Sequence, residues 1–251
     1  MKNMMKLAGG AFALATAFAA TAHAADDDHP AVKRAFDLPP SADLAYTITA
    51  RKGGLALNGD ATITWRAGEG KYAVGAESRV AVLGKLTENH SSGAIDSYGL
   101  APESFSEKRI RKEETTATFD RAAKTIGFSD GDKTYPIRGG EQDRVSISWQ
   151  LVGVARAAKD KFKPGSEWQF FVVGPRDADP WTFRVVGREK VQTGLGELDA
   201  VHVSRATPPG SREQTLDMWL APAQEWYPVK LRFTEGDREV VEQTLQKVSK
   251  K

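Results

Sequence analysis

The chain has 251 residues, 40% of them hydrophobic, with no cysteine and a formal net charge of +2. The lack of cysteine excludes disulfides, thiol nucleophiles and thiolate metal sites. Its 35 basic and 33 acidic residues nearly balance, and the excess lysines, Lys2 and Lys6, lie in the first 24 residues. The remainder therefore has no basic excess that would predict binding to nucleic acid.

Residues 1–24 are expected to be a cleavable secretory signal peptide. Two lysines are followed by an apolar run from Leu7 to Ala22, and Ala22-His23-Ala24 is a small-x-small cleavage motif. The apolar run is shorter than the ~20 residues that a membrane-spanning helix needs. No second run of this kind follows, so no transmembrane segment is expected in the mature chain. The predicted location is the bacterial periplasm.

Residues 25–40 are predicted to be a flexible leader, and residues 41–251 a single β-rich domain. The leader begins with Asp26, Asp27 and Asp28 and carries His29. An Asp/His cluster at a free N-terminus could hold a metal loosely. A solvated tail is favoured, because no second ligand cluster in the chain would complete the site.

Most of the remaining sequence alternates apolar and polar residues with a period of two, which is typical of antiparallel strands with one buried face. Short turns between successive runs, such as Gly53-Gly54, favour antiparallel pairing. The predicted strands are Leu44–Ala50, Leu55–Trp65, Tyr72–Val82, one starting at Phe105, Glu113–Phe119, Lys124–Phe128, Tyr135–Ile137, Glu167–Val173, Trp181–Val186, Leu198–Arg205, Gln214–Leu220, Tyr227–Phe233 and Glu239–Val248.

The stretch from Asp143 to Ala158 follows a helical period instead. Ile147, Leu151 and Val154 recur on one face, and Asp143 is a suitable N-cap residue before them. Residues 145–151 also alternate, so a strand is the competing interpretation. The length of the apolar pattern and its alanine pairs favour a helix.

The predicted fold is mainly β (α+β): one strongly curved antiparallel sheet or half-barrel wrapped on a single long helix. A sheet of this many strands rarely stays flat, and one-sided alternation requires a buried face. Tryptophans are expected to dominate the core, since each buries roughly 150–250 Å². They are Trp65, Trp149, Trp168, Trp181, Trp219 and Trp226.

No catalytic, cofactor-binding or metal-binding residue is predicted. The sequence has no phosphate-binding Walker loop, and no Gly-x-Gly-x-x-Gly follows a predicted strand. His202 is expected to be a solvent-facing strand residue. His90 and Ser91 only weakly resemble a Ser/His pair, because no strained nucleophile turn surrounds them.

Three residues are weak candidates for ligand binding. Arg109 and Arg111 would share one side of a strand, where they could contact a phosphate or lipid headgroup, although an exposed sheet face is the simpler interpretation. Trp149 would lie on the helix beside any cleft that the sheet leaves open.

Three segments carry a resemblance that spans nearly all of the chain after residue 24. They are Ser92-Gly93 with Tyr98-Gly99-Leu100-Ala101-Pro102-Glu103 and Phe105, then Gln142-Asp143 with Ser146, then Trp219-Leu220-Ala221-Pro222 with Tyr227-Pro228-Val229. In this order and spacing the chain resembles the domain-of-unknown-function 3108 family of exported bacterial proteins. The resemblance implies a β-rich periplasmic domain with one helix, and it implies no activity.

Three functions remain open from the sequence. The first is a non-catalytic periplasmic protein that binds an apolar or amphipathic envelope molecule, such as a lipid, in its sheet. The second is an envelope assembly or scaffold protein that binds another protein. The third is a hydrolase whose paired carboxylates are not recognisable in the sequence.

Overall fold

The computed structural model describes residues 29–52, 55–80, 84–158, 160–207, 214–236 and 239–251. One sheet of 15 strands contains almost all of the regular structure, in the order β8-β7-β6-β5-β4-β3-β2-β1-β15-β14-β13-β12-β11-β10-β9. Neighbouring strands pair antiparallel, except that β9 lies parallel to β10. The predicted signal peptide, residues 1–24, and Asp26–Asp28 lie outside the described residues.

The first eight strands precede the helix in sequence and follow one another as a meander. They are β1 (Ala42–Lys52), β2 (Leu55–Gly68), β3 (Lys71–Val80), β4 (Gly84–Asp96), β5 (Gly99–Arg109), β6 (Thr115–Asp120), β7 (Thr125–Phe128) and β8 (Thr134–Pro136). Later elements complete the other side of the sheet. They are β9 (Gln142–Asp143), helix α1 (Ser146–Ala157), β10 (Glu167–Val173), β11 (Ala178–Thr193), β12 (Gly196–Ala206), β13 (Thr215–Leu220), the 3-10 turn η1 (Pro222–Gln224), β14 (Pro228–Glu235) and β15 (Glu239–Lys250).

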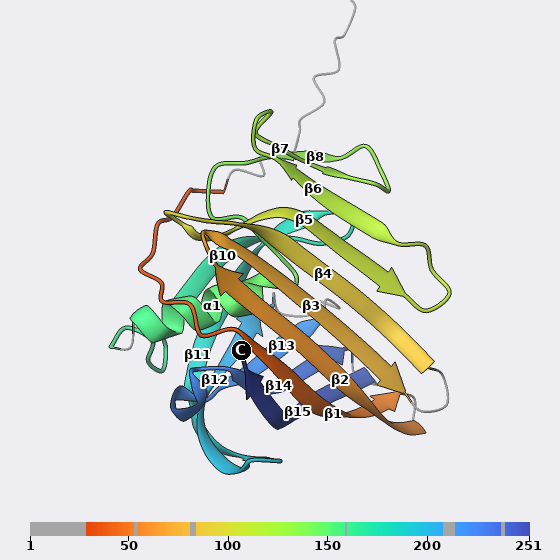
Figure 1. Ribbon diagram of the computed structural model, residues 1–251, viewed down its shortest axis with the longest axis vertical. Coiled ribbons are helices and arrows are strands. Elements are labelled where there is room, and N and C mark those ends of the chain that lie inside the picture. Colours follow the sequence, from red (N-terminus) through yellow and green to blue (C-terminus); the bar gives the residue numbers. More distant parts are fainter. Residues whose placement is uncertain (1–28, 53–54, 81–83, 159, 208–213, 237–238) are drawn as a thin grey trace, which may run out of the picture.

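The sheet is open, so the predicted strongly curved half-barrel was wrong in that respect. Edge strands β8 and β9 are not paired with each other in the described part of the chain. Side chains, rather than strand pairing, connect the two ends of the strand order. Phe105 and Phe119 from one end share a hydrophobic cluster with Phe171 and Val173 from the other. Figure 1 shows β2 to β5 passing in front of β12 to β14, with α1 at one side.

The prediction missed β4 and the first part of β5. The sequence predicted a loop at Tyr98–Pro102 and a strand only from Phe105, whereas β4 spans Gly84–Asp96 and β5 begins at Gly99. The inward positions of β4 include Thr87, Asn89 and Ser91, which are polar, so the strand lacks apolar alternation. A register irregularity between Ser92 and Gly93 further disturbs the pattern.

The helix is confirmed but is shorter than predicted and begins later. It covers Ser146–Ala157, 12 residues, and its N-cap residue is Val145, not Asp143. Asp143 belongs to β9, and its Oδ1 accepts hydrogen bonds from the backbone N–H groups of Val145 and Ser146, each at 2.8 Å. It therefore still serves as a hydrogen-bond acceptor at the start of the helix, from two residues before the cap.

The indole rings of Trp149 on α1 and Trp65 on β2 stack at the centre of the structure. Their centroids lie 4.4 Å apart with an interplanar angle of 5°, and Tyr227 meets Trp149 edge-on at 6.1 Å. All three side chains are buried. Five of the six tryptophans are buried as predicted, and Trp168 is partly buried.

Residues 29–41 form an extended strap that lies against the domain, in contrast to the flexible leader that was predicted. Figure 1 shows this orange-red segment running beside α1 before it enters β1. Its backbone accepts hydrogen bonds from Trp65 Nε1 at Pro39 and from the Tyr227 hydroxyl at Pro40. Asp37 N–H also donates to the carbonyl of Gly153, at 2.9 Å. The strap thus contacts both α1, through Gly153, and β2, through Trp65.

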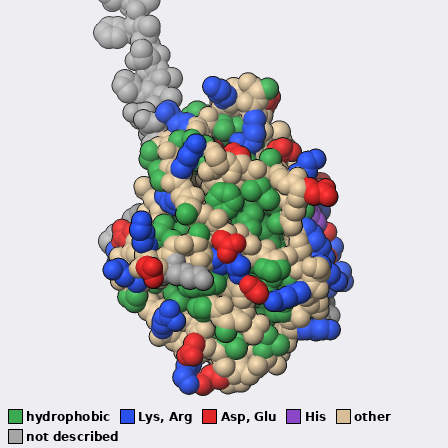
Figure 2. Space-filling model, turned by 60° about the vertical axis from the view of Figure 1, so that its left-hand side comes forward, with side chains coloured by type: hydrophobic (Ala, Val, Ile, Leu, Met, Phe, Trp, Pro, Cys, Tyr) green, Lys and Arg blue, Asp and Glu red, His purple; other side chains and the backbone are tan. Residues whose placement is uncertain are grey.

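Charged side chains of both signs are interspersed over the face of the molecule in Figure 2, with apolar patches between them. This distribution is the one expected for a chain with balanced charge. No helix in the described part of the chain has both the length and the apolar character needed to cross a bilayer.

Gln150 links α1 to the turn between β4 and β5, and this link generates the first testable prediction. Its Oε1 accepts the Leu100 N–H and its Nε2 donates to the Tyr98 carbonyl, both at 2.8 Å. Gly99, at φ 108°, lies so close that a Cβ there would approach the Gln150 amide at 2.3 Å.

Gln150→Leu should leave the Leu100 N–H and the Tyr98 carbonyl unpaired, at a cost of roughly 2 kcal/mol in the free energy of unfolding. Urea unfolding followed by tryptophan fluorescence measures the loss. Gln192→Leu, at an exposed position of β11, is the matched control and should change stability by less than about 0.5 kcal/mol. Equal stability of the two variants would show that the Gln150 amide does not stabilise this junction.

Candidate functional site

A cavity of about 400 Å³ lies between the inner face of the sheet and the first turn of α1. We call it the sheet cavity. It is lined from β1 to β5 on one side, from β13 to β15 on the other, and by residues 144–149 between them. Trp149 lies at its wall, and on the core side its indole stacks on Trp65.

One wall of the sheet cavity is apolar. It consists of aliphatic and aromatic side chains at alternate positions of the strands, which all face inwards because strand side chains alternate between faces. These residues include Ile48, Ile63, Val74, Leu216, Leu231, Phe233 and Val241. Several are only partly buried, which means that the sheet leaves their apolar surface open to the cavity.

The other wall is polar. It is formed by Asn89 of β4, Glu107 and Arg109 of β5, and Arg144 and Ser148 at the start of α1. The Asn89 Oδ1 atom is buried and has no hydrogen-bond partner. An amide without a partner in such a position is costly, because buried polar groups are normally satisfied.

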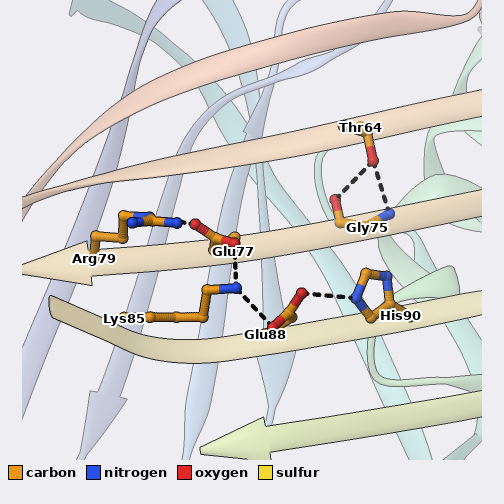
Figure 3. Close-up of polar contacts among 7 residues, drawn as sticks. All are labelled: Thr64, Gly75, Glu77, Arg79, Lys85, Glu88 and His90. Atoms are coloured by element: carbon orange, nitrogen blue, oxygen red, sulfur yellow. Dashed lines mark hydrogen bonds and ion pairs between the residues drawn. The ribbon is translucent and has the colours of Figure 1, made fainter. Parts of the chain in front are cut away.

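The two acids that line the sheet cavity are paired with cations. Glu107 Oε1 lies 2.7 Å from Arg109 Nε. Glu77 contacts Lys85 at 2.7 Å and also pairs with Arg79, in a chain of contacts along the outer face of β3 and β4 (Figure 3). These bonds, chiefly the one from Lys85, lower the pKa of Glu77.

Two of the three candidate ligand residues from the sequence line the sheet cavity. Trp149 and Arg109 belong to its walls, from α1 and from the end of β5. Arg111 does not line it; this residue lies in the turn after β5, with φ 57°, and is exposed. The expectation that Arg109 and Arg111 share one strand face therefore fails, because the strand ends at Arg109. Sequence reasoning did not single out Asn89 or Arg144.

A buried polar cluster lies next to the cavity, centred on Asp143. The Ser91 hydroxyl donates to Asp143 Oδ2 at 2.5 Å, and the Tyr72 hydroxyl lies 2.9 Å from Ser91 Oγ. Burial raises the pKa of Asp143 to about 6, although the hydrogen bonds from Ser91, Ser146 and Val145 act in the opposite direction. Burial also raises the pKa of Tyr72 well above its usual value. This cluster joins β3, β4 and the start of α1.

The histidines named in the sequence analysis do not join a Ser/His or metal arrangement. His90 contacts Glu88 on the outer face, as Figure 3 shows, whereas Ser91 faces inwards to Asp143. His202 is less exposed than predicted: it stacks on Trp219 at 4.4 Å and contacts Asp217 at 2.9 Å. Burial lowers the pKa of His202, but Asp217 and Glu189 outweigh that effect and raise it.

His29 is buried rather than solvated as predicted. Its ring stacks on Phe171 with centroids 3.8 Å apart, and its Nε2 lies 2.8 Å from Glu141 Oε1. A second cavity, of about 230 Å³, lies beside it between the strap and β10. Among the described residues, no three His, Asp or Glu side chains are grouped as a metal site would require.

The sequence matches the DUF3108 family, described as proteins of unknown function, over residues 45–241. The chain belongs to this family. The match covers every strand that contributes to the sheet cavity, from within β1 to within β15. The resemblance noted from the Tyr98–Glu103, Gln142–Ser146 and Trp219–Val229 segments is therefore confirmed. No curated protein matches the sequence significantly.

One of the three solved structures described here shares the fold, and all three are similar to this chain only at low sequence identity. A β-barrel-like protein of the DUF1849 family from Brucella abortus has a TM-score of 0.56 and 12% identity, over 88% of this chain and 100% of that one. A DUF1329 family protein from Desulfovibrio piger gives a TM-score of 0.30 at 9% identity, over 85% and 87% of the two chains. Lipoprotein LppX from Mycobacterium tuberculosis gives 0.23 at 9%, over 80% and 84%. The last two scores are too low to support any argument, and the first shows the fold alone.

Asp143 predicts a specific pH dependence of stability. Its pKa is about 6 in the folded protein against a usual value of 3.8. The folded state thus binds a proton that the unfolded state has already released, so the stabilisation from protonated Asp143 is full below about pH 4 and is lost as the pH rises through about 6. The shift corresponds to roughly 3 kcal/mol.

Asp143→Asn should remove this dependence. Urea unfolding at pH 4 and at pH 7 measures it as the stability of the variant minus that of the wild type, a difference that should rise by roughly 2.4 kcal/mol from the lower to the higher pH. Asp199→Asn, which removes an exposed carboxylate of β12, is the control for net charge. A difference for Asp143→Asn that does not change with pH would contradict the raised pKa.

Proposed function

We propose that this protein is a non-catalytic periplasmic binding protein that holds an apolar or amphipathic envelope molecule in the sheet cavity. The observation that carries the proposal is the cavity itself. Its volume of about 400 Å³ lies within the ~300–1,000 Å³ range of small-molecule sites. Its walls combine a large apolar surface with a few polar groups, which is the usual composition of such sites.

The apolar wall would supply most of the binding free energy. Each CH₂ group moved from water to an apolar site contributes about 0.8 kcal/mol, so a chain of about eight would contribute roughly 6 kcal/mol before the costs of association. Ile63, Leu231 and Phe233 offer that surface without rearrangement of the sheet. A linear acyl chain suits the site because apolar contact is non-directional.

The polar groups of the site support a binding role more than a catalytic one. Glu107 is held by Arg109, and Glu77 by Lys85 and Arg79, so each acid that lines the cavity is paired with a cation. Asp143, whose raised pKa would suit proton transfer, is fully buried behind Ser91 and bonded to backbone N–H groups. A general acid or base must reach its substrate, and this carboxyl is enclosed by the protein.

Filling the cavity should weaken binding without unfolding the protein. Ala76 of β3 lines the sheet cavity, so Ala76→Phe should place a ring in it and weaken binding of a fluorescent long-chain fatty acid at least tenfold. Ala73→Phe is the matched control, because Ala73 lies on the same strand but is exposed on the opposite face. Equal affinity of the two variants would place the ligand elsewhere. Hydrolysis of an ester-linked ligand by the wild type would contradict the non-catalytic role.

Export is the other part of the proposal, and it rests on the first 24 residues of the sequence. Intact-mass analysis of protein from a periplasmic extract should show a chain that starts at Ala25. A variant with Asp in place of both Ala22 and Ala24 should accumulate as the uncleaved precursor, because the cleavage site requires small residues. Full-length wild-type protein in the cytoplasmic fraction would contradict the predicted location.

A further inference from the structure

The lining of the sheet cavity contains both apolar and polar residues, and the two kinds are unevenly distributed. Most of its apolar lining comes from β1 to β3 and β13 to β15, which also contribute the polar residues Glu77, Ser78 and Gln243, and the rest of its polar lining is concentrated in β4, β5 and the residues that lead into α1. A ligand that was apolar throughout would leave the polar wall without partners, including the buried Asn89 Oδ1. The cavity is therefore complementary to a molecule with an apolar part and a polar part.

Arg144 determines the charge of that polar part. Its backbone N–H is fixed by a 3.1 Å hydrogen bond to the Val173 carbonyl, and the residue is one of those that line the cavity. In the described part of the chain the guanidinium makes no hydrogen bond, and its ion pair is with Asp177 Oδ1 at 4.0 Å. The Arg144 side chain is 35% exposed, so its guanidinium is accessible from solvent rather than enclosed in the core.

The other charged groups of the cavity have nearer partners. Arg109 is paired with Glu107 at 2.7 Å, and Glu77 is neutralised from outside the cavity by Arg79 and Lys85. Arg144 thus contributes a positive charge whose ion pair, with Asp177 at 4.0 Å, is longer than those of the other charged groups. A guanidinium binds carboxylate and phosphate groups in a two-pronged geometry, and the Asn89 amide on the same wall can donate or accept a hydrogen bond, depending on its rotation.

We propose that the ligand of the sheet cavity is an anionic amphiphile, whose carboxylate or phosphate head group binds Arg144 while its chain lies along Trp149 and the apolar wall. This inference rests on the proposed function, since it names the class of ligand for the same cavity. Asp177 acts as a competitor for the same guanidinium, so the head group replaces a weak intramolecular ion pair with close hydrogen bonds.

The test compares ligands that differ only in the head group. Hexadecanoate, hexadecyl phosphate and hexadecanol are titrated below their aggregation limits against the purified mature protein, with displacement of a fluorescent probe as the readout. Wild type should bind both anionic ligands about tenfold more tightly than the alcohol, because a charge-assisted hydrogen bond is stronger than a neutral one. A preference for only one anion would identify the head group as carboxylate or phosphate.

Variants then assign the preference to Arg144. Arg144→Gln should bind hexadecanol as wild type does but lose the tenfold preference for the anions. Asp177→Asn should strengthen anion binding about twofold or more, since the competing carboxylate is gone. Arg188→Gln, at an exposed position of β11, is the control and should change neither affinity.

The outcomes separate this inference from the function on which it rests. If wild type binds hexadecanol and the anions equally, or if Arg144→Gln retains the preference, the head-group assignment is wrong although the cavity binds amphiphiles. If none of the ligands binds wild type, the proposed function fails and the assignment fails with it. An anion preference that is lost only in Arg144→Gln supports both.

Discussion

The stacking of Trp149 on Trp65 is the contact on which the rest of the structure depends. It attaches α1 to β2, near the middle of the strand order. Each indole buries roughly 150–250 Å², which corresponds to about 4–6 kcal/mol of gross apolar burial per ring. The strap joins the same two elements, since Trp65 Nε1 of β2 donates to the Pro39 carbonyl and Asp37 N–H donates to the Gly153 carbonyl of α1. The helix therefore has one fixed position relative to the sheet.

A cavity follows from that position, because the helix is much shorter than the strands it packs on. The 14 residues of β2 extend about 46 Å, whereas the 12 residues of α1 span about 18 Å. Only the start of the helix, including Ser148 and Trp149, reaches the cavity, while Leu151 and Val154 pack into the core formed with β10 to β13. The part of the sheet near the N-terminal end of α1 has no helix over it, and its inner face lines the cavity.

The sequence predicted most strands and the helix correctly because their burial is one-sided and regular. β15 was predicted from Glu239 to Val248 and is observed from Glu239 to Lys250. β4 was missed because Thr87, Asn89 and Ser91 face inwards, where a period-two pattern requires apolar residues. The shorter helix was missed for a related reason: Asp143 looks like a cap in sequence, but its carboxyl is shared between the helix start and Ser91. Long-range pairings of this kind leave no periodic signal.

The candidate site residues show the same contrast between features that leave a signal in the sequence and features that depend on long-range contacts. Trp149 could be identified because a tryptophan on the one predicted helix must face whatever space the sheet leaves. Arg144 could not, since its proposed role depends on Asp177 being 4.0 Å away and on the pairing of Arg109 with Glu107. The positions where the apolar pattern fails are those that form the polar wall and the Asp143 cluster. Consistent local patterns specify a fold, and departures from them are expected at functional sites.

At Asp143 the departure has a measurable cost, because a buried carboxyl with a pKa of about 6 destabilises the folded protein when it is ionised at neutral pH. That cost is tolerated beside a cavity whose lining includes Arg144, and this agrees with the proposed binding site better than with a core that is packed only for stability.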